Sequence, residues 1–369
     1  MENKLLLAGA GCGKTTYLVK KALSVGNKSV LITTYTQANE NEIRAKFFKL
    51  NKCIPRNIVI QTWFSFLIQH GLKPYQSYLY DDRINGLILV NQASGIKYTS
   101  KMGFPVQFKE TEEFEQHYFT PTGKVYSDKL AKLVVRMNEE SESRVISRIC
   151  KIYSNIFIDE SQDLAGHDLS IVKLLSLNSE NLELVCDPRQ VTYLTHLERK
   201  FGKYKDGKIL EFVQTECKKS NFEIDTTSLS KSWRCNQEIC DYSNLLYPGL
   251  PTCNSEENNL SGIDGIYMVK KKKCKQYLEQ FNPVQLRWDA RTETFDEYKT
   301  LNFGVSKGLT FERVLIYPTK DMLKWINNTE AKLSSGARAK FYVGITRAKY
   351  SVGIVYDEDD FEPIEMKCY

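Results

Sequence analysis

The segment "LLLAGAGCGKTTYLVKKAL", residues 5–23, constrains this chain more than any other part of its sequence. A short apolar run, predicted to be a buried strand, leads into a loop of small residues and then into a helix-like stretch. Gly9, Gly11 and Gly13 allow the backbone to turn tightly and to bring its N–H groups close to a ligand. These N–H groups and the start of the helix would together bind an anion such as phosphate.

The side chains at the end of this loop favour the phosphates of a nucleotide. Lys14 can reach the outer phosphates, and the Thr15 hydroxyl can ligate Mg²⁺. An ordinary glycine-rich turn would explain the glycines but not the Gly-Lys-Thr sequence at the helix start. The pattern matches a Walker A loop that begins at Ala8. It predicts that these residues contact a nucleotide: Ala8, Gly9, Ala10, Gly11, Cys12, Gly13, Lys14, Thr15 and Thr16.

Composition excludes several classes of protein. The hydrophobic fraction of 42% and the charged fraction of 26% are ordinary for a globular chain, and no apolar run approaches membrane-spanning length. The Walker A loop starts so early that we expect no signal peptide before it. The ten cysteines are scattered without a Cys-x-x-Cys pair, which favours reduced thiols in a cytoplasmic protein over disulfides or zinc. The net charge of +6 permits a nucleic-acid partner without indicating one.

Short apolar runs alternate with helix-like segments in two successive parts of the chain. The first part contains "SVLITTY", "NIVIQTW", "NIFIDE" and "LELVCD", and the second contains "TTSLS", "GIYMVK", "VQLRW", "RVLIYP" and "YSVGIVYD". Such alternation predicts βαβ units, parallel sheets and therefore an α/β fold. We expect two domains, residues 1–210 and 211–369, with a small polar and aromatic insertion at about 73–150 in the first.

The segment "NIFIDESQDL", residues 155–164, adds two carboxylates to the predicted nucleotide site. Asp159 and Glu160 follow an apolar strand, and the C-terminal ends of parallel strands meet at one crevice. In ATPases with a phosphate loop, a carboxylate in this place helps to hold Mg²⁺, and its neighbour can accept a proton from the attacking water. A strand that runs into an acidic turn is common by itself. Together with the Walker A loop, it favours ATP hydrolysis.

Taken in order, these motifs resemble those of the UvrD/Rep/PcrA group of superfamily 1 DNA helicases. The resemblance runs from residue 5 to about residue 356. It implies two tandem RecA-like P-loop domains with ATP bound in the cleft between them. The other segments that resemble motifs of this group are "TTYTQANENEI" (33–43), "QTWFSF" (61–66), "CDPRQVTY" (186–193), "SKSWRCNQEI" (230–239), "VSKGLTFERVLI" (305–316) and "FYVGITRAKYSVGIV" (341–355).

The resemblance implies a role for residues in each motif. Thr15 and Asp159 would hold Mg²⁺, Glu160 would activate water, and Gly308 would lie near the nucleotide. Arginines from the second domain would stabilise the charge of the transition state. The catalytic set is Lys14, Thr15, Asp159, Glu160, Gln190, Arg234 and Arg347. The residues implied to bind single-stranded DNA are Tyr35, Thr36, Thr62, Trp63, Phe64, Tyr193 and Ser306. An aromatic residue is more often part of a core, and Tyr35 and Tyr193 are the best candidates for stacking on bases.

The chain also departs from the group's pattern. We find no glutamine-containing segment before the first strand to read adenine, and Thr310 stands where the group has a glutamate facing the ribose. Phe64 replaces the usual histidine. The insertion in the first domain is shortened to residues 73–150, and the stretch before Lys307 is too short for a second one. The sequence therefore predicts a nearly bare two-domain motor.

Two functions remain open. The first is an ATP-dependent translocase or helicase on single-stranded DNA, with 3′-to-5′ polarity implied by the resemblance. The second is a DNA-stimulated ATPase that acts as a regulatory or sensor subunit for a partner nuclease or a defence or repair complex, with little unwinding of its own. A small-molecule kinase would explain the Walker A loop and none of the later motifs.

Overall fold

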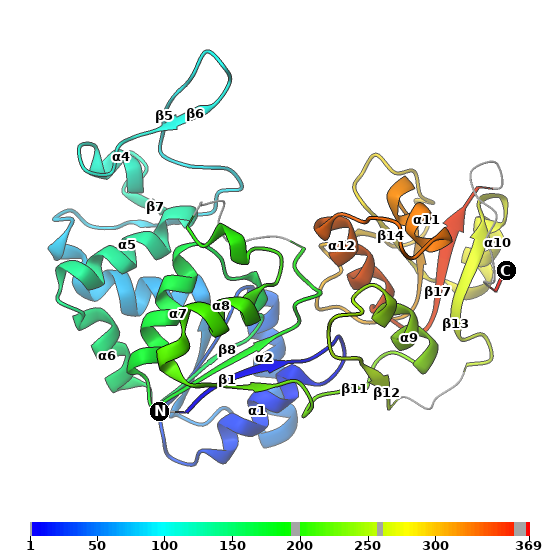
Figure 1. Cartoon of the computed structure of the whole chain (residues 1–369), viewed down its shortest axis with the longest axis horizontal. Coiled ribbons are helices and arrows are strands. Elements are labelled where there is room, and N and C mark those ends of the chain that lie inside the picture. The colour runs from blue at the N-terminus through cyan, green and yellow to red at the C-terminus, as the bar shows by residue number, and fades with distance from the viewer. Residues whose placement is uncertain (1, 193–199, 257–260, 358–366) are drawn as a thin grey trace. The chain divides into compact units, whose positions relative to one another are not determined.

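The computed structural model describes residues 2–192, 200–256, 261–357 and 367–369 (Figure 1). The chain forms two compact units. Unit 1 comprises Met1–Leu5, Thr15–Val185 and Leu194–Ile224. Unit 2 comprises Leu6–Lys14, Cys186–Tyr193 and Asp225–Tyr369.

Unit 1 is built on a sheet whose order is β10-β1-β9-β8-β2-β3. The pairs β2–β3, β2–β8 and β8–β9 are parallel. The strands are rich in buried aliphatic residues, as expected of a parallel sheet with helices on both faces. Their bounds are β1 Glu2–Leu7, β2 Val30–Thr34, β3 Ile58–Thr62, β8 Asn155–Ile158, β9 Asn181–Cys186 and β10 Phe222–Asp225.

Helices connect these strands. Helix α7 packs against both α5 and α6, so these two helices belong to the main body of unit 1, although α5 lies within residues 73–150 and α6 begins there. The α-helices are α1 Lys14–Ser24, α2 Gln37–Asn51, α3 Trp63–Phe66, α4 Phe114–Tyr118, α5 Ser127–Glu140, α6 Arg144–Ile152, α7 His167–Asn178 and α8 Ile209–Glu216. The shorter helical segments are η1 Leu67–Leu72, η2 Lys73–Tyr78, η3 Ser161–Asp163, η4 Gly202–Tyr204 and η5 Lys218–Ser220.

A β-hairpin projects from unit 1 within the expected insertion (Figure 1). It consists of β5 Ile96–Thr99 and β6 Pro105–Gln107, which pair antiparallel. A second small sheet at its base pairs β4 Gly86–Ile88 with β7 Lys124–Tyr126 in parallel. Met102 and Phe104, at and beside the hairpin's turn, are 84% and 67% exposed. The hairpin therefore presents apolar side chains to solvent.

Unit 2 contains a second parallel sheet, with the order β13-β17-β16-β14-β15. Its strands are β13 Gly265–Lys270, β14 Val284–Arg287, β15 Thr300–Asn302, β16 Phe311–Ile316 and β17 Ala348–Tyr356. A short parallel pair joins β11 Lys231–Ser232 to β12 Asn254–Ser255. The helices are α9 Gln237–Leu245, η6 Lys271–Lys273, α10 Cys274–Phe281, α11 Lys320–Asn327 and α12 Ser335–Ile345.

The predicted α/β fold with parallel sheets is confirmed. One predicted strand, "TTSLS", is wrong, because residues 226–229 form a turn. The carboxylate of Asp225 accepts the N–H groups of Thr227 and Ser228, which bends the chain there. The expected domain boundary at residue 210 falls inside α8, because β10 still belongs to the sheet of unit 1.

The phosphate loop belongs to unit 2, although most of the strand before it and most of the helix after it belong to unit 1. The segments Leu6–Lys14 and Cys186–Tyr193 begin with the last residues of the neighbouring strands β1 and β9, and Ala8 N–H donates to Cys186 O at 3.0 Å. Both segments are grouped with residues 225–369. The phosphate loop therefore shares one compact unit with residues 225–369.

Candidate nucleotide site

The phosphate loop has the backbone expected of a Walker A motif. Gly11 and Gly13 have φ angles of 75° and 81°, a region that favours glycine. The Lys14 ammonium donates to the carbonyl oxygens of Ala8 at 3.2 Å and Gly9 at 2.9 Å. The lysine therefore lies across the loop, where it can meet a phosphate with a short movement of its side chain. Thr15 and Thr16 follow in the first turn of α1.

The segment around β11 packs directly on this loop. The Ser232 hydroxyl donates to Ala10 O at 3.1 Å, and Trp233 N–H donates to Gly11 O at 3.0 Å. A Cβ atom on Gly11 would lie 2.7 Å from Arg234 Cβ, so only glycine permits this approach. Arg234 is thus beside the phosphate loop, and its guanidinium donates to Thr346 O at 3.3 Å.

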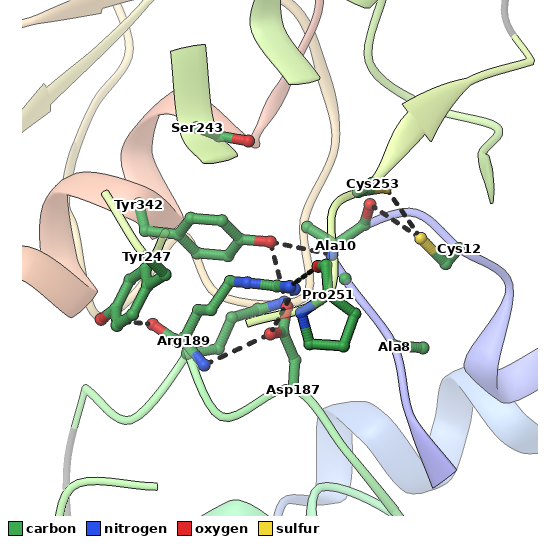
Figure 2. Close-up of polar contacts among 12 residues, drawn as sticks. Ala8, Ala10, Cys12, Asp187, Arg189, Ser243, Tyr247, Pro251, Cys253 and Tyr342 are labelled. Atoms are coloured by element: carbon green, nitrogen blue, oxygen red, sulfur yellow. Dashed lines mark hydrogen bonds and ion pairs between the residues drawn. The ribbon is translucent and has the colours of Figure 1, made fainter. Parts of the chain in front are cut away.

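A buried carboxylate links the phosphate loop to two motifs that are distant in sequence. Asp187 accepts hydrogen bonds from Gln190 Nε2 at 2.7 Å, from Arg189 Nη1 at 3.3 Å and from the Tyr342 hydroxyl at 3.3 Å. The same phenol oxygen accepts the N–H of Ala10 at 3.1 Å. Figure 2 shows the Tyr342 hydroxyl between Ala10 and Asp187, with Arg189 beside them. Burial, reinforced by Asp187, raises the pKa of Tyr342 well above its ordinary value, so the phenol remains a donor.

Arg347 is buried and held by the backbone. Its guanidinium donates to Val343 O at 3.0 Å and to Leu309 O at 3.2 Å, and Nη2 lies 3.4 Å from Gln190 Oε1. Gln190 and Arg347, both in the predicted catalytic set, therefore contact each other. Gly308 lies in the exposed loop beside Leu309 and has a φ angle of 84°.

The two predicted acidic residues lie in unit 1, directly after β8. Asp159 N–H donates to Thr33 O at 2.8 Å, and the Asp159 carboxylate accepts Glu160 N–H at 2.9 Å. Glu160 has a φ angle of 54°, in the left-handed region that non-glycine residues seldom adopt. Such strain costs about 1–3 kcal/mol and is concentrated at functional sites. The carboxylate of Glu160 also accepts a hydrogen bond from Gln162.

The oxygen donors present fit Mg²⁺ bound together with a nucleotide. Thr15 supplies a hydroxyl and Asp159 a carboxylate, and Mg²⁺ commonly combines one or two such groups with phosphate oxygens and water. Among the described residues, no group of three or more His, Cys, Asp or Glu side chains could hold a metal ion. Binding of Mg²⁺ here would thus depend on the nucleotide's own oxygens.

The family model AAA_19, described as an AAA domain, matches residues 1–196, which is more than half of the chain. The chain belongs to the AAA_19 family. No curated protein matches this AAA_19 chain significantly. In the part of the chain that the structure describes, no helix combines the length and apolar character needed to cross a membrane.

Two solved structures of Arterivirus nonstructural protein 10, a helicase, are similar to this AAA_19 protein. The first is 14% identical, with a TM-score of 0.47, over 96% of this chain and 59% of that one. The second, a complex with DNA, is 14% identical, with a TM-score of 0.46, over 97% of this chain and 61% of that one. The AAA_19 chain thus spans less than two thirds of the length of either.

Aromatic side chains of the AAA_19 protein meet at the strand ends of unit 1. Tyr35 follows β2 and Phe64 follows β3, and Thr34 pairs with Thr62 at the ends of these strands. The rings of Tyr35 and Phe64 lie edge to face with centroids 5.4 Å apart, and both are partly exposed. Burial, with smaller effects from nearby aspartates, raises the pKa of Tyr35 to about 12. This aromatic pair can offer a stacking surface.

Other residues predicted to bind DNA make contacts within the protein. Trp63 is only 1% exposed and its indole N–H donates to Asp168 at 2.6 Å, while the buried Ser306 hydroxyl donates to Phe303 O at 2.7 Å. The structure therefore does not place Trp63 or Ser306 where DNA could touch their side chains. Thr36 and Thr62 cap the N-termini of α2 and α3. Tyr193 lies outside the described residues.

The sequence interpretation overlooked several residues near the loop. Tyr342 belongs to the segment "FYVGITRAKY", in which only Arg347 was predicted to be a site residue. Arg189 was not predicted to belong to the site, yet it is buried against Asp187 and its guanidinium carbon lies 5.7 Å from the centre of the Tyr342 ring. Trp233 is 67% exposed beside the loop. In the sequence, its position directly before the predicted catalytic residue Arg234 is the signal that it lies near the nucleotide site.

Proposed function

We propose that this AAA_19 protein is an ATP-dependent translocase or helicase that acts on single-stranded DNA. The 3′-to-5′ polarity is taken from the resemblance to the UvrD/Rep/PcrA group. The observation that carries the proposal is the surroundings of the phosphate loop. Residues from three distant motifs, at 187–190, 232–234 and 342–347, gather on it within one compact unit. A phosphate loop that only bound a nucleotide would not need them.

In this proposal, the loop N–H groups and Lys14 bind the outer phosphates of ATP. Thr15 and Asp159 would hold Mg²⁺ together with the phosphates, and the bound ion would supply positive charge that offsets the charge of the transition state. Glu160 accepts a proton from the attacking water. Arg234 lies beside the loop, so a modest movement of its side chain would bring the guanidinium to the transferring phosphate.

The proposed coupling to DNA follows the strand ends of unit 1. Asp159 N–H donates to Thr33 O in β2, and Tyr35 lies two residues after Thr33, directly beyond the end of this strand. The parallel neighbour of that strand ends at Thr62 and leads to Phe64. The acidic residues and the aromatic pair therefore belong to the same edge of one sheet. A shift of Asp159 during the ATP cycle would reach the stacking surface through these adjacent strands.

A pair of matched glutamate variants tests the chemistry. Glu160→Gln should still bind ATP but lose about 10²–10⁴-fold in hydrolysis, because the water loses its base. Glu142 is exposed and has a similar φ angle of 53°, so Glu142→Gln controls for the backbone conformation and should hydrolyse at the parent rate. Lys14→Ala should abolish ATP binding. Hydrolysis by Glu160→Gln at the parent rate would show that this carboxylate is not the base.

The alternative is a DNA-stimulated ATPase that regulates a partner nuclease or a defence or repair complex. It is favoured by the simple architecture of unit 2, because the described elements between Arg234 and Lys307 form its own sheet, helices and short strand pair. A strand-displacement assay beside a DNA-stimulated ATPase assay separates the two functions. Stimulated hydrolysis without displacement, restored by a partner, would support the regulatory function.

A further inference from the structure

Two buried cysteines meet at the phosphate loop. Cys12 lies in the loop, Cys253 directly precedes β12, and their sulfur atoms are 3.0 Å apart (Figure 2). The proposed hydrolysis uses neither thiol. We infer that Cys12 and Cys253 form an oxidation site, at which a hydroperoxide converts the two thiols into a disulfide that closes the phosphate loop to nucleotide. This inference rests on the proposed function of the loop.

The positions of both residues suit a disulfide. The bond needs a sulfur–sulfur distance of about 2.05 Å, so the two sulfur atoms must approach by about 1 Å. Cys253 already packs on the loop, since its Cβ lies 3.2 Å from where a Cβ on Gly9 would be. The Asn244 side chain accepts Cys253 N–H at 3.1 Å and donates to Cys253 O at 3.0 Å. Helix α9 therefore holds Cys253 towards Cys12.

A disulfide between Cys12 and Cys253 would restrict the backbone of the phosphate loop. Cys12 lies between Gly11 and Gly13, whose left-handed backbone gives the loop its shape. Binding of phosphate requires the N–H groups of this stretch to point at the ligand. The approach of about 1 Å needed for a covalent link at Cys12 would displace these N–H groups, and the link would hold the segment before β12 against the loop. The disulfide form should therefore bind ATP much more weakly than the thiol form.

The reaction balances with a hydroperoxide as the only oxidant. The thiolate of one cysteine attacks the peroxide, an S–O bond forms, the O–O bond breaks, and water or an alcohol leaves after protonation. The second sulfur then attacks the sulfenic acid, the S–S bond forms, and the S–O bond breaks with release of water. Two thiols are oxidised to one disulfide, and the peroxide is reduced. No metal or further reductant takes part.

The surroundings make this reaction slow. The hydrogen bond between Cys12 and Cys253 and burial both raise the pKa of Cys12. Contact with Cys12 lowers the pKa of Cys253, but Cys240 and burial outweigh it and raise the value to about 12. Thiolate is thus scarce at neutral pH, and we expect oxidation to take on the order of minutes to hours.

The test oxidises the full-length chain with hydrogen peroxide and blocks the remaining thiols with iodoacetamide. Peptide mapping without reductant should find Cys12 linked to Cys253. The affinity for a fluorescent ATP analogue should fall at least tenfold and return after dithiothreitol. Cys253→Ser and Cys253→Ala should keep their affinity through the same treatment, and either variant suffices if the other fails to fold. Cys53→Ser removes an exposed cysteine and should behave as the parent chain.

Three results would overturn the inference: no link between Cys12 and Cys253, a link from Cys253 to Cys240 instead, or a mapped Cys12–Cys253 link that leaves the affinity for the analogue unchanged. Failure of the proposed function is distinguishable from all three. In that case the reduced parent chain would not bind ATP at all, whether or not the cross-link forms.

Discussion

The carboxamide oxygen of Gln190 lies 3.4 Å from Nη2 of Arg347, and the amide nitrogen of Gln190 lies 2.7 Å from Asp187. Both ends of the carboxamide are therefore engaged, and its orientation is determined by a carboxylate on one side and a guanidinium on the other. A side chain held in this way can respond to a phosphate only if Arg347 or Asp187 moves as well.

Loss of the Gln190 side chain should therefore affect turnover more than binding. We expect Gln190→Ala to lower kcat for ATP hydrolysis by about 10²–10³-fold, which is the usual effect of removing one hydrogen-bond donor that stabilises a transition state. The affinity for ATP should change by less than about threefold. Steady-state kinetics and a separate binding titration measure the two effects. Gln280→Ala alters an exposed glutamine of unit 2 and serves as the control. An equal loss of affinity and turnover would mean that Gln190 serves ground-state binding.

Removal of the Tyr342 hydroxyl should destabilise the protein. In Tyr342→Phe, Ala10 N–H loses its acceptor and Asp187 loses a donor, both in buried surroundings. We expect the free energy of unfolding to fall by about 1–3 kcal/mol. The matched control is Tyr242→Phe, because the buried Tyr242 hydroxyl has no hydrogen-bond partner among the described residues. Urea unfolding should show little change for this control, and equal effects of the two variants would contradict the prediction.

Trp233 should stack on the base of the nucleotide. Its side chain is 67% exposed while its backbone N–H is bonded to the phosphate loop. Trp233→Ala should raise KM for ATP by about tenfold with little change in kcat, and Trp233→Phe should retain most of the affinity. Leu245→Ala, at an exposed apolar position of unit 2, is the control.

Selectivity among nucleotides should be weak, because stacking does not distinguish one base from another. GTP or dATP should support turnover nearly as well as ATP. A preference for ATP of more than about a hundredfold, near 2.7 kcal/mol, would require a group that reads adenine or the ribose.

The hairpin of unit 1 should matter for duplex opening and not for hydrolysis. Met102→Ser and Phe104→Ser, combined, remove exposed apolar groups, so stability should change by less than about 0.5 kcal/mol. The fraction of a short 3′-tailed duplex that is unwound should fall. Each base-pair step resists opening by roughly 1.4 kcal/mol, and the variant lacks the apolar surface that would keep the strands apart. Single-turnover unwinding and DNA-stimulated ATPase assays measure the two activities.

Phe48→Ser changes an exposed aromatic residue of α2 and should leave duplex opening intact. Loss of hydrolysis in the hairpin variant would show that the hairpin serves the motor itself. Opening of long duplexes by the purified monomer in a single binding event would contradict the prediction of a bare motor.

Local sequence signals were sufficient for much of the fold. The apolar runs that lead to Lys14 and Asp159 form β1 and β8, because buried parallel strands need continuous aliphatic residues. The glycines of the phosphate loop have the conformations that their spacing predicted. Such features depend on neighbours within about ten residues, which a single sequence displays directly.

The remaining features depend on contacts that no local pattern reveals. Trp63 lies in a motif that resembles a DNA-binding segment, yet a carboxylate from α7 binds its indole in the core. Ala10 and Tyr342 are separated by 332 positions, and nothing near either residue indicates the other. The pairing of Cys12 with Cys253 is equally non-local. These contacts arise only when distant segments pack together.

The separation between Ala10 and Tyr342 also has a consequence for biosynthesis. At about 5–20 residues per second, a ribosome that has made the phosphate loop needs roughly 20–70 s more to reach Tyr342. During this interval the nascent loop has neither the phenol that binds it nor the helix α12 that carries that phenol. A chain interrupted before α12 would keep a complete Walker A sequence with an unsupported loop. Maturation of the nucleotide site is therefore a late event in the synthesis of this protein.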